Sequence, residues 1–122
     1  MEQYHLSDSE YRFLQVVWAA EPVGSGELVR LCAGELGWKK STTYTVLKKL
    51  CEKGVLKNEN STVSSAVPRE TVAGDAAEAF VEKAFGGSLP AFVAAFLSDR
   101  TISPAEAEEL RRMIEESEGR HG

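Results

Sequence analysis

The 122-residue sequence contains few cysteines and histidines, and it has no long apolar run. Cys32 and Cys51 do not form a Cys-x-x-Cys pair. Each falls on the apolar face of a predicted helix, so we interpret both as buried thiols in a reducing compartment. His5 and His121 stand near opposite ends of the chain, so no set of metal ligands is available within a fold. No apolar run approaches the roughly 20 residues of a membrane span, so we expect no membrane insertion. We also expect no metal and no cofactor.

The residue patterns of catalytic sites and of secretion signals are also missing. No serine or cysteine nucleophile stands near a histidine, and no glycine-rich loop is suited to cradling a phosphate. No pair of carboxylates stands outside the predicted solvated acidic helix faces. The N-terminus has neither the basic nor the apolar region of a secretory signal. We therefore expect a cytoplasmic protein that is not an enzyme.

The net charge of −5 is unevenly distributed along the chain. Residues 1–70 contain nine basic and nine acidic side chains, whereas residues 71–122 contain five and ten. Within the first part, residues 38–57 hold six lysines against Glu52 alone. Attraction to phosphates depends on the local field, because distant carboxylates are screened beyond about 8–10 Å. The acidic total therefore does not exclude binding to DNA.

The lysine-rich stretch from residue 39 to residue 54 predicts a half-buried helix with a basic outer face. Ser41 is placed to cap its first turn, and Gly54 is suited to the left-handed conformation that ends a helix. Short hydroxyl side chains near the start and lysines further along suit a helix that enters a DNA groove. The alternative is an ordinary amphipathic helix with a solvated face. The apolar stripe at helical spacing consists of Thr43, Val46, Leu47, Leu50 and Cys51.

Elements on both sides of this helix complete a recognisable arrangement. Two β-prone runs, 55–57 and 62–68, flank the polar turn 58–61 and predict a hairpin that ends at Pro68. Before the helix, the spacing predicts a helix that starts at a Ser7 capping box, a short extended segment at 22–24 and a helix over 26–36 capped by Ser25. Gly37 supplies the turn between the second and third helices. The order is that of a winged helix-turn-helix, whose second motif helix enters the major groove.

The sequence after Pro68 predicts a polar connector at 69–74 and then three helices. We expect residues 1–72 to form the winged helix-turn-helix domain and residues 73–122 to form a helical dimerisation domain, in a mainly α fold with a small β-wing. Three helices of this length hide little apolar surface, so we expect burial against a second copy. The alternative is one larger monomer. The predicted dimerisation residues are Phe80, Phe85, Phe92, Phe96, Leu97, Leu110 and Ile114.

The expected partner of the basic face is double-stranded operator DNA, bound by a homodimer on a palindrome. Threonine methyl groups and hydroxyls suit contacts to bases, whereas lysines suit phosphates. A different class of function, a winged helix that binds an acidic protein, stays open, and a gel shift with promoter DNA at two salt concentrations distinguishes the two. The predicted DNA-binding residues are Lys39, Lys40, Ser41, Thr42, Thr43, Tyr44, Thr45, Lys48, Lys49, Lys53 and Lys57, of which Thr43 also fits the buried stripe.

Several blocks in their order and spacing resemble the penicillinase repressor family, which comprises β-lactamase, methicillin-resistance and copper-transport repressors. The similarity runs over nearly the whole chain. It implies a homodimeric winged-helix repressor that blocks transcription. The blocks are Leu-Ser-Asp-Ser-Glu-Tyr from residue 6, Leu-Gln-Val-Val-Trp from residue 14, Ser-Thr-Thr-Tyr-Thr-Val-Leu-Lys-Lys-Leu from residue 41, Lys-Gly-Val-Leu from residue 53 and Glu-Ala-Glu-Glu-Leu from residue 106.

The resemblance also implies how repression is relieved. In the antibiotic branch of the family, a membrane sensor with a metalloprotease domain leads to cleavage of an Asn-Phe bond in the dimerisation helices. The corresponding bond here is Ala95–Phe96, which keeps the phenylalanine but not the asparagine. The copper branch carries a C-terminal cysteine cluster that this sequence lacks.

Overall fold

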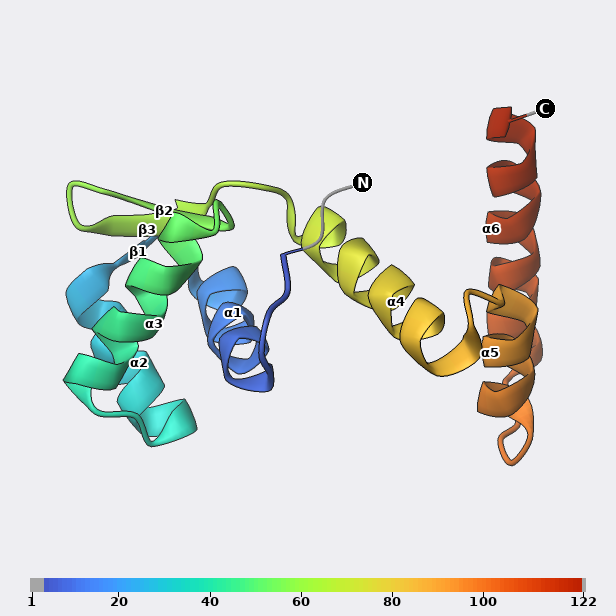
Figure 1. Cartoon of the computed structure of the whole chain (residues 1–122), viewed down its shortest axis with the longest axis horizontal. Helices are drawn as coiled ribbons and strands as arrows, with labels where there is room; N and C mark the ends of the chain where they lie inside the picture. The colour runs from blue at the N-terminus through green and yellow to red at the C-terminus, as the bar shows by residue number, and fades with distance from the viewer. Residues whose placement is uncertain (1–3, 122) are drawn as a thin grey trace. The chain divides into compact units, whose positions relative to one another are not determined.

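The computed structural model describes residues 4–121. These residues form helices and one small sheet (Figure 1). The chain divides into two compact units, one ending at Phe80 and the other beginning at Val81. The prediction of a mainly α fold with a small β-wing is confirmed. The elements are α1 (Asp8–Ala20), β1 (Val23–Gly24), α2 (Ser25–Leu36), α3 (Lys40–Glu52), β2 (Leu56–Glu59), β3 (Thr62–Ser65), α4 (Arg69–Phe85), α5 (Leu89–Leu97) and α6 (Pro104–His121).

The core of the first unit is built on α1. The predicted capping box is present: the Glu10 amide donates to Ser7 Oγ at 3.2 Å, and the Ser7 amide donates to Glu10 Oε1 at 2.8 Å. These bonds satisfy two backbone donors that would otherwise lack partners at the start of the helix. Phe13, Leu14 and Val17 are fully buried and face the inner sides of α2, α3 and the sheet.

The helix-turn-helix consists of α2, a tight turn and α3. Gly37 has φ +71°, and the amides of Gly37 and Trp38 donate to Ala33 and Cys32 carbonyls at 3.2 Å, which closes the end of α2. Both serine caps expected here were wrong. Gly24 is the N-cap of α2 because the chain leaves β1 directly into the helix, and Lys39 is the N-cap of α3, so Ser25 and Ser41 lie inside their helices.

The three strands form an antiparallel sheet in the order β1-β3-β2. Leu56 of β2 and Val63 of β3 point into the core and are almost fully buried, while most of the remaining hairpin is exposed. The hairpin turn is narrower than predicted, because Asn58 and Glu59 belong to β2 and pair with β3. The two remaining turn residues, Asn60 and Ser61, both have positive φ, which matches the right-handed twist of the strands they join.

The stretch predicted as a polar connector is the first part of α4, which begins at Arg69 instead of Asp75. The Pro68 carbonyl accepts from the Thr71 and Val72 amides, so the helix starts directly after the sheet. Val72 is 1% exposed, and burying it in the core stabilises this early start. The expected domain boundary after residue 72 therefore lies inside a continuous helix.

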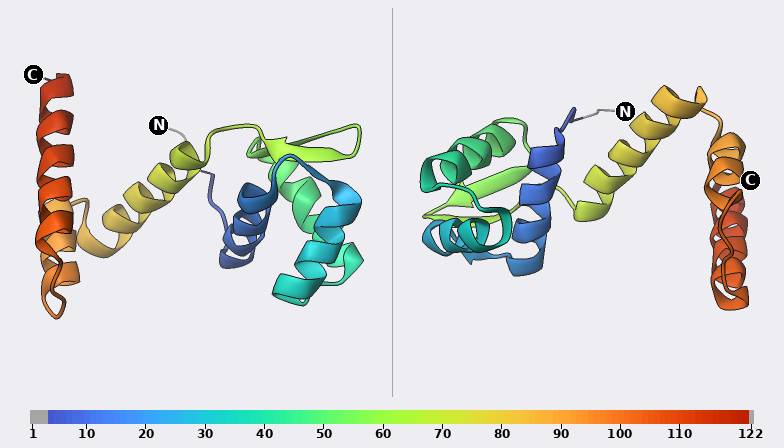
Figure 2. Two further views of the ribbon diagram at one scale, coloured as in Figure 1. Left: turned by 180° about the vertical axis from the view of Figure 1, so that it is seen from behind. Right: turned by 90° about the horizontal axis from the view of Figure 1, so that it is seen from below.

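The second unit contains α5 and α6, which lie side by side (Figure 2). Ser88 caps α5 by accepting from the Ala91 amide, and Ser103 caps α6 by accepting from the Glu106 amide. The rings of Phe85, Phe92 and Phe96 are in contact along this unit. Nevertheless, no residue between 81 and 119 is buried, so this unit has no closed core within one chain.

The hairpin turn yields a stability prediction. Ser61 has φ +63°, a conformation that costs L-residues about 1–2 kcal/mol and glycine almost nothing. Ser61→Gly should therefore raise the free energy of unfolding by about 0.5–1 kcal/mol, measured by urea denaturation. The matched change Ser64→Gly, in the extended part of β3, should lower it. A Ser61→Gly variant no more stable than the parent would contradict the assigned turn.

Candidate nucleic-acid interface

The outer face of α3 carries a group of exposed cations. Lys39, Lys40, Lys48 and Lys49 are all exposed, and none of the four forms an ion pair with another described residue. Their charges are therefore not neutralised locally. We call these four lysines, with exposed Ser41, Thr42, Tyr44 and Thr45, the basic face.

Two hydroxyl hydrogen bonds on α3 distinguish a surface threonine from a structural one. Thr45 is exposed, and its Oγ1 donates to the Ser41 carbonyl at 2.9 Å. Thr43 is 1% exposed, and its Oγ1 donates to the Lys39 carbonyl at 3.2 Å. A hydroxyl so placed cannot reach a ligand outside the protein. Thr43 therefore belongs to the buried stripe, the structural alternative that the sequence left open.

The wing lies against the same side of the motif as the basic face. Asn58 of β2 lines one hollow together with Tyr44, Leu47, Lys48 and Cys51 of α3. Sequence reasoning assigned Asn58 to the turn and so missed it as a candidate contact. The strand register that places Asn58 beside α3 depends on contacts between distant parts of the chain, which the local sequence pattern does not show. Lys57 is exposed on β2, and its phosphate contact stays a prediction.

Lys53 makes its hydrogen bonds and its ion pair within the protein. Its Nζ donates to Glu10 Oε1 at 2.9 Å, to Glu10 Oε2 at 3.0 Å and to the His5 carbonyl at 3.3 Å. The Glu10 side chain is only 7% exposed, so this ion pair is partly buried and ties the end of α3 to the start of α1. We therefore leave Lys53 out of the proposed DNA contacts.

The ion pair changes how Glu10 titrates. Burial alone would raise the pKa of this carboxyl, but hydrogen bonds from the Ser7 amide and from Lys53, together with the Lys53 charge, outweigh it and hold the pKa below its ordinary value. A carboxyl with a lowered folded-state pKa stabilises the fold above its unfolded-state pKa. That stabilisation is lost as the pH falls through the folded-state value.

The inner side of α3 rests on apolar contacts rather than on polar ones. Leu47 and Leu50 are buried, and the Trp38 ring before the helix stacks on Phe13 at 5.8 Å, with the planes 6° apart. Trp38 therefore packs under the turn. Cys32 is buried, Cys51 is half-buried, and burial raises the pKa of both thiols. Unreactive thiols of this kind are consistent with a packing role.

Neither a metal site nor a membrane-spanning helix is found in the part of the chain that the structure describes. Residues 4–121 contain no group of three or more histidine, cysteine, aspartate or glutamate side chains arranged to hold a metal ion. Within the same range, no single helix is both long and apolar enough to cross a membrane.

A tight helix-turn-helix, a two-stranded wing beside its second helix and an exposed cationic face together define a winged helix-turn-helix protein of the nucleic-acid-binding type. The family model described as "Penicillinase repressor" matches residues 6–116. The chain belongs to this family, which is one of repressors and not of enzymes, and the resemblance found in the sequence is confirmed.

Relatives of known name align along nearly the full length of the chain. The methicillin resistance regulatory protein MecI of Staphylococcus aureus is 23% identical over 115 residues, covering 91% of this chain and 94% of the relative. The penicillinase repressor of Bacillus licheniformis is 23% identical over 119 residues, covering 94% and 93%. The solution structure of monomeric Bacillus licheniformis BlaI with the blaP half-operator is 21% identical. It covers 54% of this chain and 85% of that one with a TM-score of 0.48.

The Glu10–Lys53 pair yields a pH-dependent prediction. Glu10→Gln should lower the free energy of unfolding at pH 7 by about 1–3 kcal/mol, because charged hydrogen bonds to Ser7 and Lys53 are removed. The difference from the parent should shrink as the pH falls through the lowered folded-state pKa of Glu10, because the parent side chain is then itself protonated. Urea denaturation at several pH values measures both effects.

A matched control is available on α2. Glu27 pairs with Arg30 on the surface, so Glu27→Gln should change stability by no more than about 0.5 kcal/mol. If the two glutamine variants were equally stable at pH 7, the Glu10–Lys53 pair would have no special role in the fold.

Proposed function

We propose that this protein is a DNA-binding transcriptional repressor that acts as a homodimer on a palindromic operator, with the basic face of α3 in the major groove and the wing beside it. The single observation that carries the proposal is the set of four exposed lysines without an ion pair to another described residue, Lys39 at the N-cap of α3 and Lys40, Lys48 and Lys49 within it. Members of the family named as repressors support the regulatory role. A repressor of this kind acts in the cytoplasm, where the bacterial chromosome lies.

The side chains of the basic face suggest a division of roles. Thr42, Tyr44 and Thr45 lie exposed on the first turns of α3, the part of a recognition helix that reaches base edges. Lys48 lies one turn further along and suits a base edge or the adjacent phosphate. The remaining lysines suit phosphates, which position the helix without reading sequence. They are Lys39, Lys40, Lys49 and, on the wing, Lys57.

Dimerisation is proposed from the exposed apolar surface of the second unit. Phe96 is 50% exposed, Leu110 43% and Ile114 61%, and α5 has no buried residue at all. Large apolar side chains left in water are unfavourable by about 25 cal/mol per Å² of surface. A two-fold partner that covers them would also place two α3 helices on one DNA duplex about 34 Å apart. Partly covered Phe85, Phe92 and Leu97 would line the rim of the same interface.

Release of the operator then follows from separation of the dimer. Ala95 and Phe96 are both exposed, but the bond between them lies inside α5. A protease that cuts there must first unwind the helix, so we propose cleavage only as one route. Any signal that separates the C-terminal helices has the same effect, including a membrane sensor metalloprotease of the kind that the family implies.

Single lysine substitutions test the DNA contacts. Lys48→Ala and Lys49→Ala should each weaken operator binding and reduce the slope of log K against log salt by about 0.9 for every phosphate that the side chain no longer binds. Lys83→Ala, at an exposed lysine of α4 that does not belong to the basic face, is the control and should leave the slope unchanged. A parent-like slope in either α3 variant would show that this lysine binds no phosphate.

A charge placed in the exposed apolar surface tests dimerisation. Phe96→Asp should convert the protein to monomers at micromolar concentration and abolish operator binding, because the interface would have to bury a charge among apolar side chains. Sedimentation velocity measures the mass. Thr101→Asp adds the same charge in the exposed loop between α5 and α6 and should remain dimeric. If Phe96→Asp stayed dimeric, the interface would lie elsewhere.

A further inference from the structure

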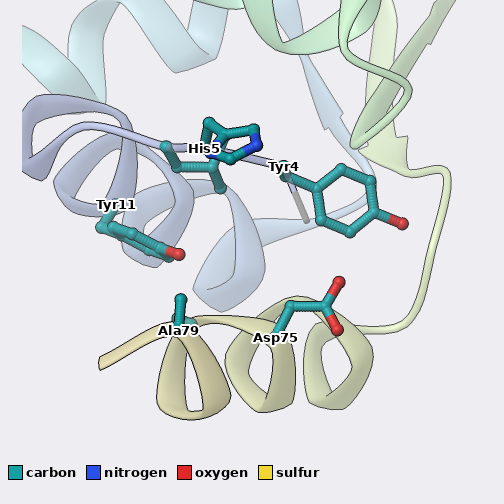
Figure 3. A pocket seen from close by; sticks show the side chains of 7 residues that line it. Tyr4, His5, Tyr11, Asp75 and Ala79 are labelled. Atoms are coloured by element: carbon teal, nitrogen blue, oxygen red, sulfur yellow. The ribbon is translucent and has the colours of Figure 1, made fainter. Parts of the chain in front are cut away.

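The first unit contains a small pocket that no residue of α3 lines (Figure 3). It measures about 180 Å³ and lies between the N-terminal segment, α1 and α4. Tyr4 and His5 form one wall, Tyr11 of α1 a second, and Asp75 with Ala79 of α4 a third. A cavity of roughly 150 Å³ holds a benzene-sized molecule, so this pocket has room for a ligand of about six non-hydrogen atoms.

The feature that gives the pocket its chemistry is the carboxylate of Asp75. Asp75 is 7% exposed, and it makes no hydrogen bond or ion pair with another residue of the described chain. In Figure 3 its side chain rises from α4 toward the segment that carries Tyr4. The carboxylate therefore has no bonded partner among the described residues, and a cation that enters the pocket would pair with it without displacing another group.

Among the described residues, no lysine, arginine or histidine forms an ion pair with Asp75. Glu10 is the second acid close to Tyr11, and Lys53 already neutralises it. The same lysine donates to the His5 carbonyl, so its ammonium is held on the Glu10 side of the segment. Burial, and then the negative charges of Asp75 and Glu10, raise the pKa of Tyr11, so the phenol stays neutral. The pocket is therefore electronegative and partly aromatic.

We propose that this pocket binds a small organic cation, namely a primary ammonium group on a short apolar body. The ammonium would pair with the Asp75 carboxylate, and the aromatic rings of Tyr4 and Tyr11 would add cation–π attraction. The apolar body would lie against Ala79 and its neighbours on α4. A metal ion fits poorly, because Asp75 is the one carboxylate among the described lining residues. The ligand would join the N-terminal segment, α1 and α4.

The direct test is a calorimetric titration of the full chain with n-butylammonium chloride, against n-butanol as the neutral probe of the same shape, at matched ionic strength. We expect saturable binding of the ammonium and at least about tenfold weaker binding of the alcohol, because only the cation pairs with Asp75. Amide NMR shifts should be confined to the N-terminal segment, α1 and the first turns of α4. Equal affinity for the two probes, or no saturation up to about 10 mM ammonium, overturns the proposal.

Variants on one helix separate the pocket from a general charge effect. Asp75→Asn removes the charge at nearly constant shape and should weaken ammonium binding by about tenfold or more. Glu78→Gln makes the same change at an exposed position of α4 and should leave binding unchanged. Ala79→Leu fills the pocket while keeping Asp75 and should block both probes. Parent-like ammonium binding in Asp75→Asn overturns the proposal. If that variant does not fold, the comparison of the two probes on the parent protein is the deciding test.

Discussion

The constraint on which the rest of the first unit depends is burial of one side of α3. Leu47 and Leu50 are held against α1 and the sheet, and Thr43 closes the same stripe with a hydroxyl bonded to the carbonyl of the residue that caps the helix. Because the inner side is fixed in this way, the helix has only one side left for lysines and short hydroxyls. The basic face is therefore a consequence of packing, and its proposed use in binding DNA follows from the charge that packing leaves in water.

A second set of contacts fixes how α3 ends. Lys53 reaches back to Glu10, whose carboxylate is already oriented by the Ser7 capping box, so one charged pair joins a helix start to a helix end. Gly54, with φ +80°, then turns the chain into the wing. This arrangement places Asn58 beside Lys48 and brings wing and helix to one surface. The second unit is different in kind, since its apolar side chains lack a closed core within the chain.

Much of this fold is predictable because it depends on the local periodicity of the apolar residues. The helical spacing of Leu47 and Leu50 predicts α3, and the β-prone runs predict the wing. The features that sequence reasoning misses depend on contacts between distant parts of the chain. The burial of Phe13 depends on the stacked Trp38, and the early start of α4 depends on the stability that Val72 gains from the core. Likewise, Lys53 looks in sequence like any other lysine of the basic face.

The central claim is that two copies of one basic face read DNA together. Selection of bound duplexes from a random-sequence pool by the full-length protein tests it most directly, since it assumes no operator. We expect enrichment of inverted repeats whose half-site centres are separated by whole helical turns of about 10–10.5 base pairs. Enrichment of a single unrepeated motif, or of no sequence at all, would contradict the claim.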